Sequence, residues 1–403
     1  MKLSEELQWR GFVNQTTFKD ITDLDKEKRT FYHGFDASAD SQTIGNLAAM
    51  MFDKVFIRHG YKAILLAGGA TSLIGDPGGK DAERPIQSEE AIRHNVAMAE
   101  KQLRQVFRED PFTLVNNLDW IKPLSTIEFL RDVGKYFGMS TLVQRDYIQK
   151  RIGEGGSGMS YTEFSYTLLQ GYDFLHLYRE YGCTLQLAGS DQWGNSLSGV
   201  DLIRKVESKE TNVITLPLVI NKATGKKFGK SEDGAVWLDP EKTSPYKFYQ
   251  FWLNVDDAGV GDYLKIYTLI QPEAFDALMA EFEKNPSGRA AQKYLAYEVT
   301  KLVHGEDKAE SARNVTATLF GDTPVEQLLK EDLEMLAGEI PVTTSSHVIN
   351  ALVTSGVASS NGEARRLIEG AAISINGQKI SDDQPLKTPS LIKKGKNTFV
   401  LAR

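Results

Sequence analysis

Three polar side chains stand at regular spacing in the stretch SYTEFSYTLLQGYDFLHLYREY. Tyr166, Gln170 and Asp173 follow one another at i, i+4 and i+7, a spacing that places all three on one face of a helix. A phenol, an amide and a carboxylate on one face can bind a polar ligand. They can also hydrogen-bond one another on a packed helix, and the spacing is compatible with both interpretations.

A second group of reactive side chains lies on a glycine-bearing loop. In KATGKKFGKSEDG, Lys227 and Lys230 flank Phe228 and Gly229, and Ser231 follows. Two ammonium groups and a hydroxyl on a hinged loop can close over a chain of phosphates. A lysine-rich loop that merely faces solvent is the alternative interpretation.

Two further stretches have the form of a strand, a glycine-bearing turn and a helix start. In FYHGFDASADSQTIGNLAAM, residues 30–35 are strand-like and 44–51 open a helix; in AILLAGGATSLIGDPGGKDAER, a buried strand precedes two glycines. Free backbone N–H groups at such a turn bind anions, although an ordinary βα turn has the same form. Asp76 stands where a carboxylate could hold an ammonium group, and Lys80 and Arg84 suit a triphosphate.

The elements that must position these side chains are those of a doubly wound parallel sheet. Apolar spacing predicts a helix over 162–181, a short buried strand over 184–188 and a turn that ends at Asp191. A helix that leads into a parallel strand ending in glycine and an acid predicts a ligand crevice at the carboxyl ends of the strands. We also expect a strand over 213–220 and a helical stretch over 125–137.

Length, composition and cysteine content predict a soluble globular protein with two or three domains. The chain has 403 residues, of which 41% are hydrophobic, enough for several sizeable cores. It has no 18-residue apolar run and no charged-then-apolar leader over 1–11, which argues against a membrane span or a secretory signal. The single cysteine, Cys183, cannot form an internal disulfide or a zinc cluster, which fits a reducing cytoplasm.

The charge is divided unevenly along the chain. The formal net charge is −7, but residues 345–403 carry five Lys and three Arg against two Asp and two Glu, a net of +4 that leaves −11 for the rest. A basic module on an acidic body suggests local contact with a polyanion, although a solvated basic surface has the same composition. Within this module, Ser360 and Glu363 predict a capped helix, and Asn376-Gly377 predicts a hairpin.

Together these motifs resemble the bacterial tyrosyl-tRNA synthetases, and the match runs along essentially the whole chain. TEFSY..LQ.YDF is followed by GSDQWGN, FYHGFDASADSQTIGN is similar to the family's Y.GFDPTADSLHIGH, and KFGKS is a form of the class I KMSKS loop. NGEARRLIEGAAISINGQKI resembles an S4-type RNA-binding domain. The resemblance implies an α/β fold with a Rossmann-like catalytic domain (1–231), an α-helical anticodon-binding domain (232–322), a linker (323–342) and an S4-like domain (343–403).

The resemblance also implies an activity and a role for each site residue. Tyrosine and ATP would give tyrosyl-adenylate and pyrophosphate, and the tyrosyl group would then pass to the terminal ribose of tRNA(Tyr). The implied tyrosine-binding residues are Tyr32, Asp76, Tyr166, Gln170, Asp173, Gln186 and Gln192. The implied ATP-binding residues are Asp36, Ser38, Gly45, Asn46, Asp191, Lys227 and Lys230. The implied catalytic residues, most of which would gather the pyrophosphate, are Lys80, Arg84, Lys227, Lys230, Ser231, Thr43 and Asn46.

The chain departs from the family at the His-Ile-Gly-His signature. Thr43 and Asn46 replace the two histidines, which in the family help to stabilise the transition state, and His33 and Ala37 also differ from the usual residues. An Asn amide can donate a hydrogen bond from roughly the place of a ring nitrogen, whereas Thr is too short to reach a distant phosphate without a water. Either the Thr43 position is empty, or the local site is rebuilt around threonine.

Further partners follow from the resemblance. Mg²⁺ would arrive on ATP, and no metal or organic cofactor is expected on the protein itself. The helical region 121–147 would contribute to the interface of a homodimer, and no membrane contact is expected. The expected RNA contacts are Arg365, Arg366, Lys379, Lys393, Lys394 and Lys396.

Two other functions compete with this interpretation. Thr43 and Asn46 would suit a duplicate that kept the fold, lost strong aminoacylation and acts as an RNA-binding or regulatory protein; the retained substrate residues argue against it. A different nucleotidyl transferase with a similar sheet does not explain the S4-like tail. Tyrosine-dependent ATP–pyrophosphate exchange distinguishes the first alternative from an active synthetase.

Overall fold

The computed structural model describes residues 1–76, 87–231 and 234–403, which divide into two compact units. The first unit comprises Met1–Thr243 and Val255–Leu295, and the second comprises Ser244–Asn254 and Ala296–Arg403. The domain boundaries expected at 231, 322 and 342 stay predictions.

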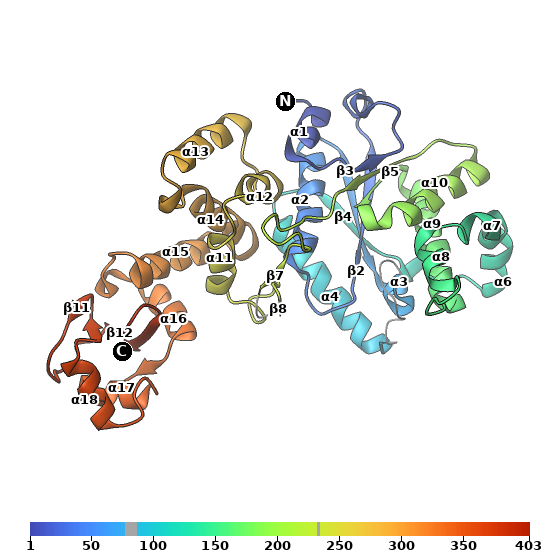
Figure 1. The fold of residues 1–403 in the computed structure, drawn as a ribbon. Helices are drawn as coiled ribbons and strands as arrows, with labels where there is room; N and C mark the ends of the chain where they lie inside the picture. The colour runs from blue at the N-terminus through green and yellow to red at the C-terminus, as the bar shows by residue number, and fades with distance from the viewer. Residues whose placement is uncertain (77–86, 232–233) are drawn as a thin grey trace. The chain divides into compact units, whose positions relative to one another are not determined.

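A six-stranded sheet forms the centre of the first unit (Figure 1). Its order is β1-β6-β5-β2-β3-β4, in which β1 pairs antiparallel with β6 and the other neighbours are parallel. The chain runs from β2 outward to β4 on one side and later returns to β5 on the other, so the switch point lies between β2 and β5. The expected doubly wound sheet is confirmed. Its strands are β1 (Gln15–Thr16), β2 (Thr30–Asp36), β3 (Lys62–Gly68), β4 (Phe112–Asn116), β5 (Cys183–Gly189) and β6 (Asn212–Leu216).

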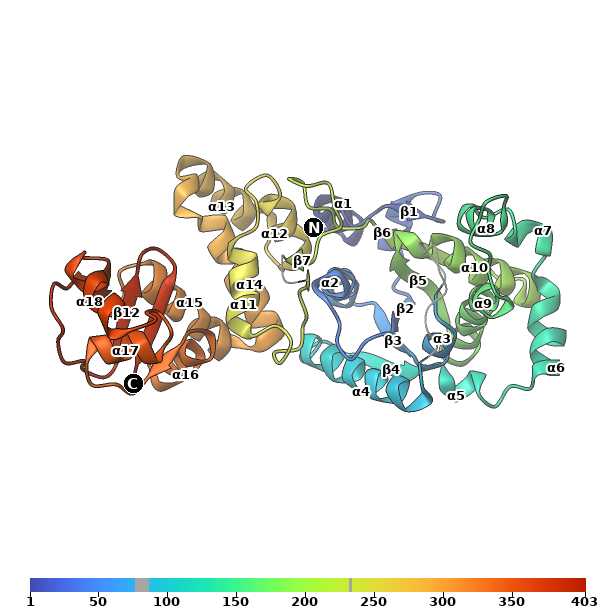
Figure 2. The ribbon, with the colours of Figure 1, turned by 60° about the horizontal axis from the view of Figure 1, so that its bottom comes forward.

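Helices cover both faces of this sheet, with α2 and α4 on one face and α9 and α10 on the other (Figure 2). Alternation along β2 directs Phe31 to Phe56 of α2, with ring centroids 5.5 Å apart, and Tyr32 to Phe174 of α9, at 5.1 Å. A parallel sheet covered on both faces requires such apolar strands. The helices of this unit are α1 (Leu3–Arg10), α2 (Ile44–Arg58), α3 (Gly69–Ile74), α4 (Glu89–Val106), α5 (Leu118–Ile121), α7 (Met139–Leu142), α8 (Asp146–Ile152), α9 (Tyr161–Tyr181), α10 (Trp193–Glu207), α12 (Val260–Tyr267) and α13 (Pro272–Lys284).

One expected element differs from the structure, and three are confirmed. The strand expected over 213–220 ends at Leu216, because Pro217 has no N–H with which to extend the ladder. The helical stretch expected over 125–137 consists of α6 (Thr126–Glu128), a π-helical turn (Phe129–Val133) and a 3₁₀ turn (Gly134–Tyr136). The helix predicted over 162–181 is α9, and the strand predicted over 184–188 is β5.

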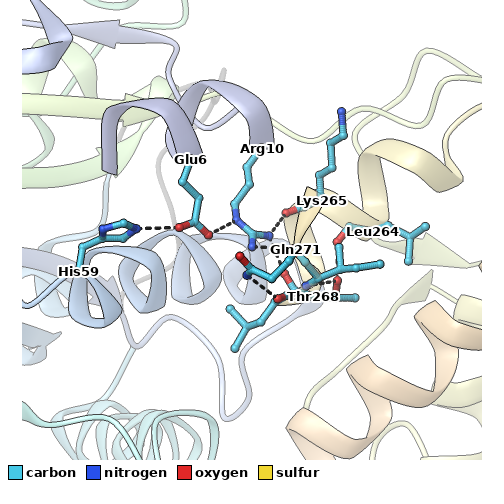
Figure 3. A network of polar contacts seen from close by, with 9 residues as sticks. Glu6, Arg10, His59, Leu264, Lys265, Thr268 and Gln271 are labelled. Atoms are coloured by element: carbon cyan, nitrogen blue, oxygen red, sulfur yellow. Dashed lines mark hydrogen bonds and ion pairs between the residues drawn. The ribbon is translucent and has the colours of Figure 1, made fainter. Parts of the chain in front are cut away.

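A polar network joins α1 to the C-terminal end of α12 (Figure 3). Glu6 accepts from Arg10 Nε at 2.8 Å and pairs with His59 Nε2 at 2.7 Å. The Arg10 guanidinium also donates to the carbonyl oxygens of Lys265 and Thr268, at 2.7 and 2.8 Å. The last carbonyls of a helix have no partner within the helix, so Arg10 supplies the donors that end α12.

The second unit ends in a five-stranded sheet of order β11-β10-β12-β13-β9, whose apolar face packs on α17 and α18. Asn376 and Gly377, both with positive φ, form the expected hairpin between β10 and β11. Ser360 caps α18 as expected, but the Glu363 carboxylate bonds Ser359. The first unit also contains the short strands β7 (Lys230–Ser231) and β8 (Gly234–Ala235). The remaining α-helices and strands are α11 (Pro245–Leu253), α14 (Ala290–His304), α15 (Glu306–Phe320), α16 (Lys330–Glu339), β9 (Val342–Thr343), α17 (Val348–Thr354), α18 (Asn361–Glu369), β10 (Ile373–Ile375), β11 (Gln378–Lys379), β12 (Ser390–Lys394) and β13 (Thr398–Ala402).

Candidate active site

Asp173 of α9 is the centre of a buried polar cluster, which we call the inner cluster (Tyr32, Asn117, Trp120 and Asp173). Its carboxylate is held by Asn117 Nδ2 at 3.0 Å and by Trp120 Nε1 at 2.8 Å, and the residue is 2% exposed. Burial raises the pKa of Asp173 to about 7, although the two donors act in the opposite direction. Asn117 and Trp120 follow β4 in no recognisable motif, so sequence patterns do not reveal them.

Three of the predicted tyrosine-binding residues have buried polar atoms without a partner among the described residues. They are Tyr32 Oη on β2, Gln170 Oε1 on α9 and Gln186 Oε1 on β5. Burial and the charge of Asp173 raise the pKa of Tyr32 well above its usual value, so the hydroxyl stays neutral and can donate as well as accept. Buried polar atoms are rarely left unpaired in native proteins. These atoms therefore suit a polar ligand.

The negative charges of three carboxylates act on the Tyr166 hydroxyl. The hydroxyl donates to Asp36 Oδ2 at 3.2 Å, and Asp36 is the last residue of β2. Burial, followed by the charges of Asp36, Asp76 and Asp173, raises the pKa of Tyr166 well above its usual value. Negative charge concentrated around a buried phenol favours a cation such as an ammonium group. The structure thus brings together Asp36, expected at ATP, and Tyr166, expected at the ammonium group.

A chain of hydrogen bonds orients the carboxylate of Asp76. Thr167 Oγ1 donates to Asn195 Oδ1 at 2.7 Å, Asn195 Nδ2 to Gln192 Oε1 at 3.1 Å, and Gln192 Nε2 to Asp76 Oδ2 at 2.6 Å. Each amide has its oxygen and nitrogen ends assigned by its neighbours. Gln192, expected to orient the amino acid, therefore orients the carboxylate of Asp76 in this structure. Thr167 and Asn195 lie inside the two recognised motifs, but their roles depend on this contact.

The turn before α2 and the lysine loop adjoin, although about 190 residues separate them. Ile44 N–H donates to the Val236 carbonyl at 3.1 Å. Val236 N–H donates to the Gly229 carbonyl, also at 3.1 Å. Gly229 has φ +112°, and a Cβ there would lie 3.2 Å from Ile44 Cγ1. Glycine at this position therefore lets the loop backbone approach the signature turn.

The aromatic residue of the lysine loop docks on α12. The rings of Phe228 and Tyr263 stack with centroids 4.2 Å apart and an interplanar angle of 23°. Lys227 is exposed. Lys230 and Ser231 form β7 by their backbone, but their side chains lie outside the described part of the structure, as do residues Lys80 and Arg84 as a whole.

Two other predicted ATP contacts lie at the carboxyl ends of the central strands. Ser38 is exposed after β2, and its carbonyl accepts from Gln87 Nε2 at 3.0 Å. Asp191 is exposed in a 3₁₀ turn directly after β5. A Cβ at Gly189 would lie 2.6 Å from Asp191 Oδ1, so the glycine permits this carboxylate to fold over the end of the strand.

The basic residues of the C-terminal module are divided between two faces of its sheet. Lys379 and Lys393 both pair with Ser374, from the two neighbouring strands. Lys394 is one residue further along β12 and donates to the Val357 carbonyl at 3.0 Å, so it points to the opposite face. Arg365, Arg366 and Lys396 are exposed.

Comparison with known proteins identifies the family. Residues 24–321 match the tRNA synthetases class I (W and Y), and residues 332–402 match the tyrosine–tRNA ligase SYY-like C-terminal domain. The tyrosine–tRNA ligase of Bacillus caldotenax is 44% identical over an alignment that covers 100% of both chains. The chain belongs to the tyrosine–tRNA ligases. The resemblance seen in the sequence motifs is therefore confirmed.

Other tyrosine–tRNA ligases extend this result to different organisms and to solved structures. The Bacteroides thetaiotaomicron ligase is 42% identical over 100% of this chain and 99% of its own. A C-terminally truncated mitochondrial tyrosyl-tRNA synthetase of Aspergillus nidulans has a TM-score of 0.70 and 29% identity, over 77% of this chain and 92% of that chain. Among the described residues of this ligase, no helix is long and apolar enough to cross a membrane.

Proposed function

We propose that the chain activates L-tyrosine with ATP and then transfers the tyrosyl group to the 3′-terminal ribose of tRNA(Tyr). In the first step a tyrosine carboxylate oxygen bonds to the α-phosphorus, and the bond to the bridging oxygen breaks to release pyrophosphate. In the second step the ribose hydroxyl attacks the tyrosyl carbonyl, and AMP leaves. A carboxylate is already ionised at neutral pH, so activation depends on alignment and charge stabilisation.

The inner cluster and the carboxylates around Tyr166 carry this proposal, because together they match the two ends of tyrosine. Tyr32 and Asp173 would receive the phenol at the buried end. Asp76 and Tyr166, with the charge of Asp36 beside them, would hold the ammonium group. Phenylalanine would leave the buried acceptor of Asp173 without the phenolic donor, a cost of roughly 1–3 kcal/mol or more for a buried polar group. Gln170 and Gln186, whose buried oxygens have no partner in the described residues, would bind the same ligand.

The phosphates would lie at what we call the outer cluster (Thr43, Gly45, Asn46, Phe228 and Gly229). The first turn of α2 offers the positive end of a helix dipole, although its Ile44 N–H already donates to the Val236 carbonyl. Lys227, Lys230, Ser231, Lys80 and Arg84 would gather the pyrophosphate. Asp191 would contact the ribose, and Ser38 a phosphate. Mg²⁺ would enter with ATP as part of the substrate and neutralise phosphate charge.

ATP–pyrophosphate exchange with tyrosine, with phenylalanine and with no amino acid tests this proposal. We expect exchange with tyrosine and very little with phenylalanine. The substitutions at Thr43 and Asn46 favour the second candidate, a weakened paralogue that binds RNA. No tyrosine-dependent exchange, together with retained binding of tRNA(Tyr), would establish that candidate instead.

We also propose that the ligase is a homodimer whose interface includes the helical region 121–147 and its surroundings. Large apolar side chains that are 44 to 70% exposed occur over residues 127–161: Ile127, Leu130, Met139, Ile152 and Tyr161. Two of them, Leu130 and Tyr161, line a cavity of about 460 Å³ together with Ile121 and Phe129. Exposed apolar side chains concentrated in one region are typical of an interface.

Sedimentation equilibrium tests the dimer. Ile127→Asp should convert the dimer into monomers, because it places a charge in the apolar face. Leu329→Asp is the matched control, since Leu329 is 65% exposed at a distant position in the sequence. A monomeric wild type, or an Ile127→Asp variant that stays dimeric, would contradict the assignment. A cytoplasmic location and RNA contact through the C-terminal module complete the proposed function.

A further inference from the structure

Two hydrogen bonds join Thr43 to Asn46 at the first turn of α2. The backbone N–H of Thr43 donates to Asn46 Oδ1 at 3.0 Å, and Thr43 Oγ1 donates to the same oxygen at 2.9 Å. Thr43 is the N-cap of α2 and Asn46 is its third residue, so the two side chains stand as in a capping box. The two residues that replace the family's histidines are therefore in direct contact.

This contact determines which end of the Asn46 amide faces Thr43. A backbone N–H can only donate, so the amide atom beside it must be the oxygen. The Thr43 hydroxyl then uses the second lone pair of that oxygen. With Oδ1 directed at Thr43, Nδ2 and its two N–H groups project from the other branch of the amide.

The surroundings of Nδ2 suit an anionic ligand. Asn46 is partly exposed, and none of the residues within 1–76, 87–231 and 234–403 is recorded as accepting a hydrogen bond from its Nδ2. The positive end of the α2 dipole lies in the same turn, where the Ile44 N–H already donates to the Val236 carbonyl. Gly229 of the lysine loop packs beside Ile44 in this turn. The two N–H groups of the Asn46 amide, the positive end of a helix dipole and a lysine loop thus meet at one place.

We propose that Thr43 is a positioning residue, which holds the Asn46 amide so that its N–H donors, and not its oxygen, face the phosphates of ATP. This inference rests on the proposed function, because it concerns the phosphate end of that site. An unrestrained amide could turn its oxygen toward the phosphates, where two acceptors would repel each other. Thr43 therefore does not occupy an empty position; it works through Asn46, and the signature turn is rebuilt around this pair.

A double-mutant cycle measures this coupling. Thr43→Val removes the hydroxyl donor but keeps the size and β-branching of the side chain. The single-turnover rate of tyrosyl-adenylate formation should fall about 3- to 10-fold, the usual effect of one hydrogen bond, while tyrosine binding stays unchanged. Thr43→Ser should recover most of the lost rate. In an Asn46→Ala background, Thr43→Val should have no further effect.

The same cycle contains the results that would overturn the proposal. An equal slowing by Thr43→Val with and without Asn46 would mean that Thr43 acts on the phosphates directly or on the fold. No slowing in the wild-type background would mean that the amide needs no restraint. Wild-type enzyme without any tyrosine-dependent exchange would instead refute the proposed function, so the two failures are distinguishable.

Asn46→Asp gives a second test that does not depend on the stability of the Thr43 variants. Aspartate keeps the acceptor for Thr43 and is favoured in the first turn of a helix, so this variant should fold. It presents oxygen where Asn46 presents N–H groups. Adenylate formation should be at least as slow as in Asn46→Ala, and a rate equal to that of the wild type would overturn the assigned orientation.

Discussion

Two asparagines, one in the inner cluster and one in the outer cluster, are oriented by the same kind of contact. The Ala70 N–H donates to Asn117 Oδ1 at 2.7 Å, and the Thr43 N–H donates to Asn46 Oδ1 at 3.0 Å. The Asn117 nitrogen then donates to Asp173 within the protein, and Asn117 is 0% exposed. Asn46 is partly exposed and, within the described ranges, its nitrogen has no recorded acceptor.

The difference shows that the two ends of the site are prepared for their ligands in different ways. In the inner cluster, protein donors hold the carboxylate before any ligand binds, because a buried charge without partners would be too costly. The outer cluster leaves donors and loop segments open to a ligand whose charge distribution changes during reaction. Recognition of the amino acid is therefore preorganised by buried bonds, and phosphate contact depends on backbone turns and a docked loop.

The largest expected effect is that of Asp173→Asn, which breaks the inner cluster. The amide removes the charge and directs N–H groups toward the donors Asn117 and Trp120. We expect kcat/KM for tyrosine in the exchange assay to fall at least about 100-fold, the result of losing a buried charge-assisted bond and leaving its partners unpaired. Asp119→Asn, at an exposed acid nearby in the sequence, is the control. An unchanged preference for tyrosine over phenylalanine would contradict the assignment of Asp173.

Gly229→Ala should damage the outer cluster and spare the inner one. Alanine at φ +112° is strained, and its Cβ would press on Ile44. A cost of about 1–2 kcal/mol predicts a roughly 5- to 30-fold slower activation step, with tyrosine affinity unchanged. Gly234→Ala is a matched control, because Gly234 has φ +110° but a Cβ there meets nothing within 4 Å. Equal effects of both variants would mean that backbone strain, and not contact with α2, is responsible.

The pH dependence of tyrosine binding tests the role of Asp173 in the inner cluster. The pKa of Asp173 is raised from its ordinary 3.8 to about 7, so the folded protein binds this proton more tightly than the unfolded chain. The group therefore lowers the free energy of unfolding as pH rises from about 4 to about 7. If the phenol requires the ionised carboxylate, tyrosine affinity should rise about tenfold from pH 6 to pH 8.

Calorimetry at pH 6, 7 and 8 measures this effect and the proton released on binding. Asp173→Asn should abolish the pH dependence of whatever affinity remains. An affinity that falls with pH would show that the protonated carboxyl is the form that binds. ATP affinity measured in the same series should not follow this titration, because the phosphate end lies outside the inner cluster.

The smallest expected effect is that of Tyr263→Leu, which removes the ring that Phe228 stacks on. Aromatic pairs contribute about 0.5–1.5 kcal/mol beyond area burial, so the activation step should slow about 2- to 10-fold. Tyr263→Phe keeps the ring and should behave like the wild type in a single-turnover assay. If both variants slow the reaction equally, the hydroxyl contact to Asp256, and not the stacking, holds the loop.

Local sequence patterns were sufficient for several elements of the architecture. Helical spacing predicted α9, the glycine and acid after β5 predicted the crevice end of the sheet, and Asn376-Gly377 predicted the hairpin. These features depend on periodicity and on backbone conformations that a few residue types favour. The end of β6 also follows from one local residue, because Pro217 has no N–H with which to extend the ladder.

The tertiary structure alone determined how the site residues are held. Asn117 and Trp120 donate hydrogen bonds to Asp173 from more than 50 positions away in the sequence. No residue spacing predicts that contact. Thr43 and Asn46 are only three residues apart, but the direction of the amide depends on the geometry of the N–H beside it. The sequence determined which functional groups are present. The fold determined which of their atoms already have partners, because hydrogen bonds depend on distance and direction in space.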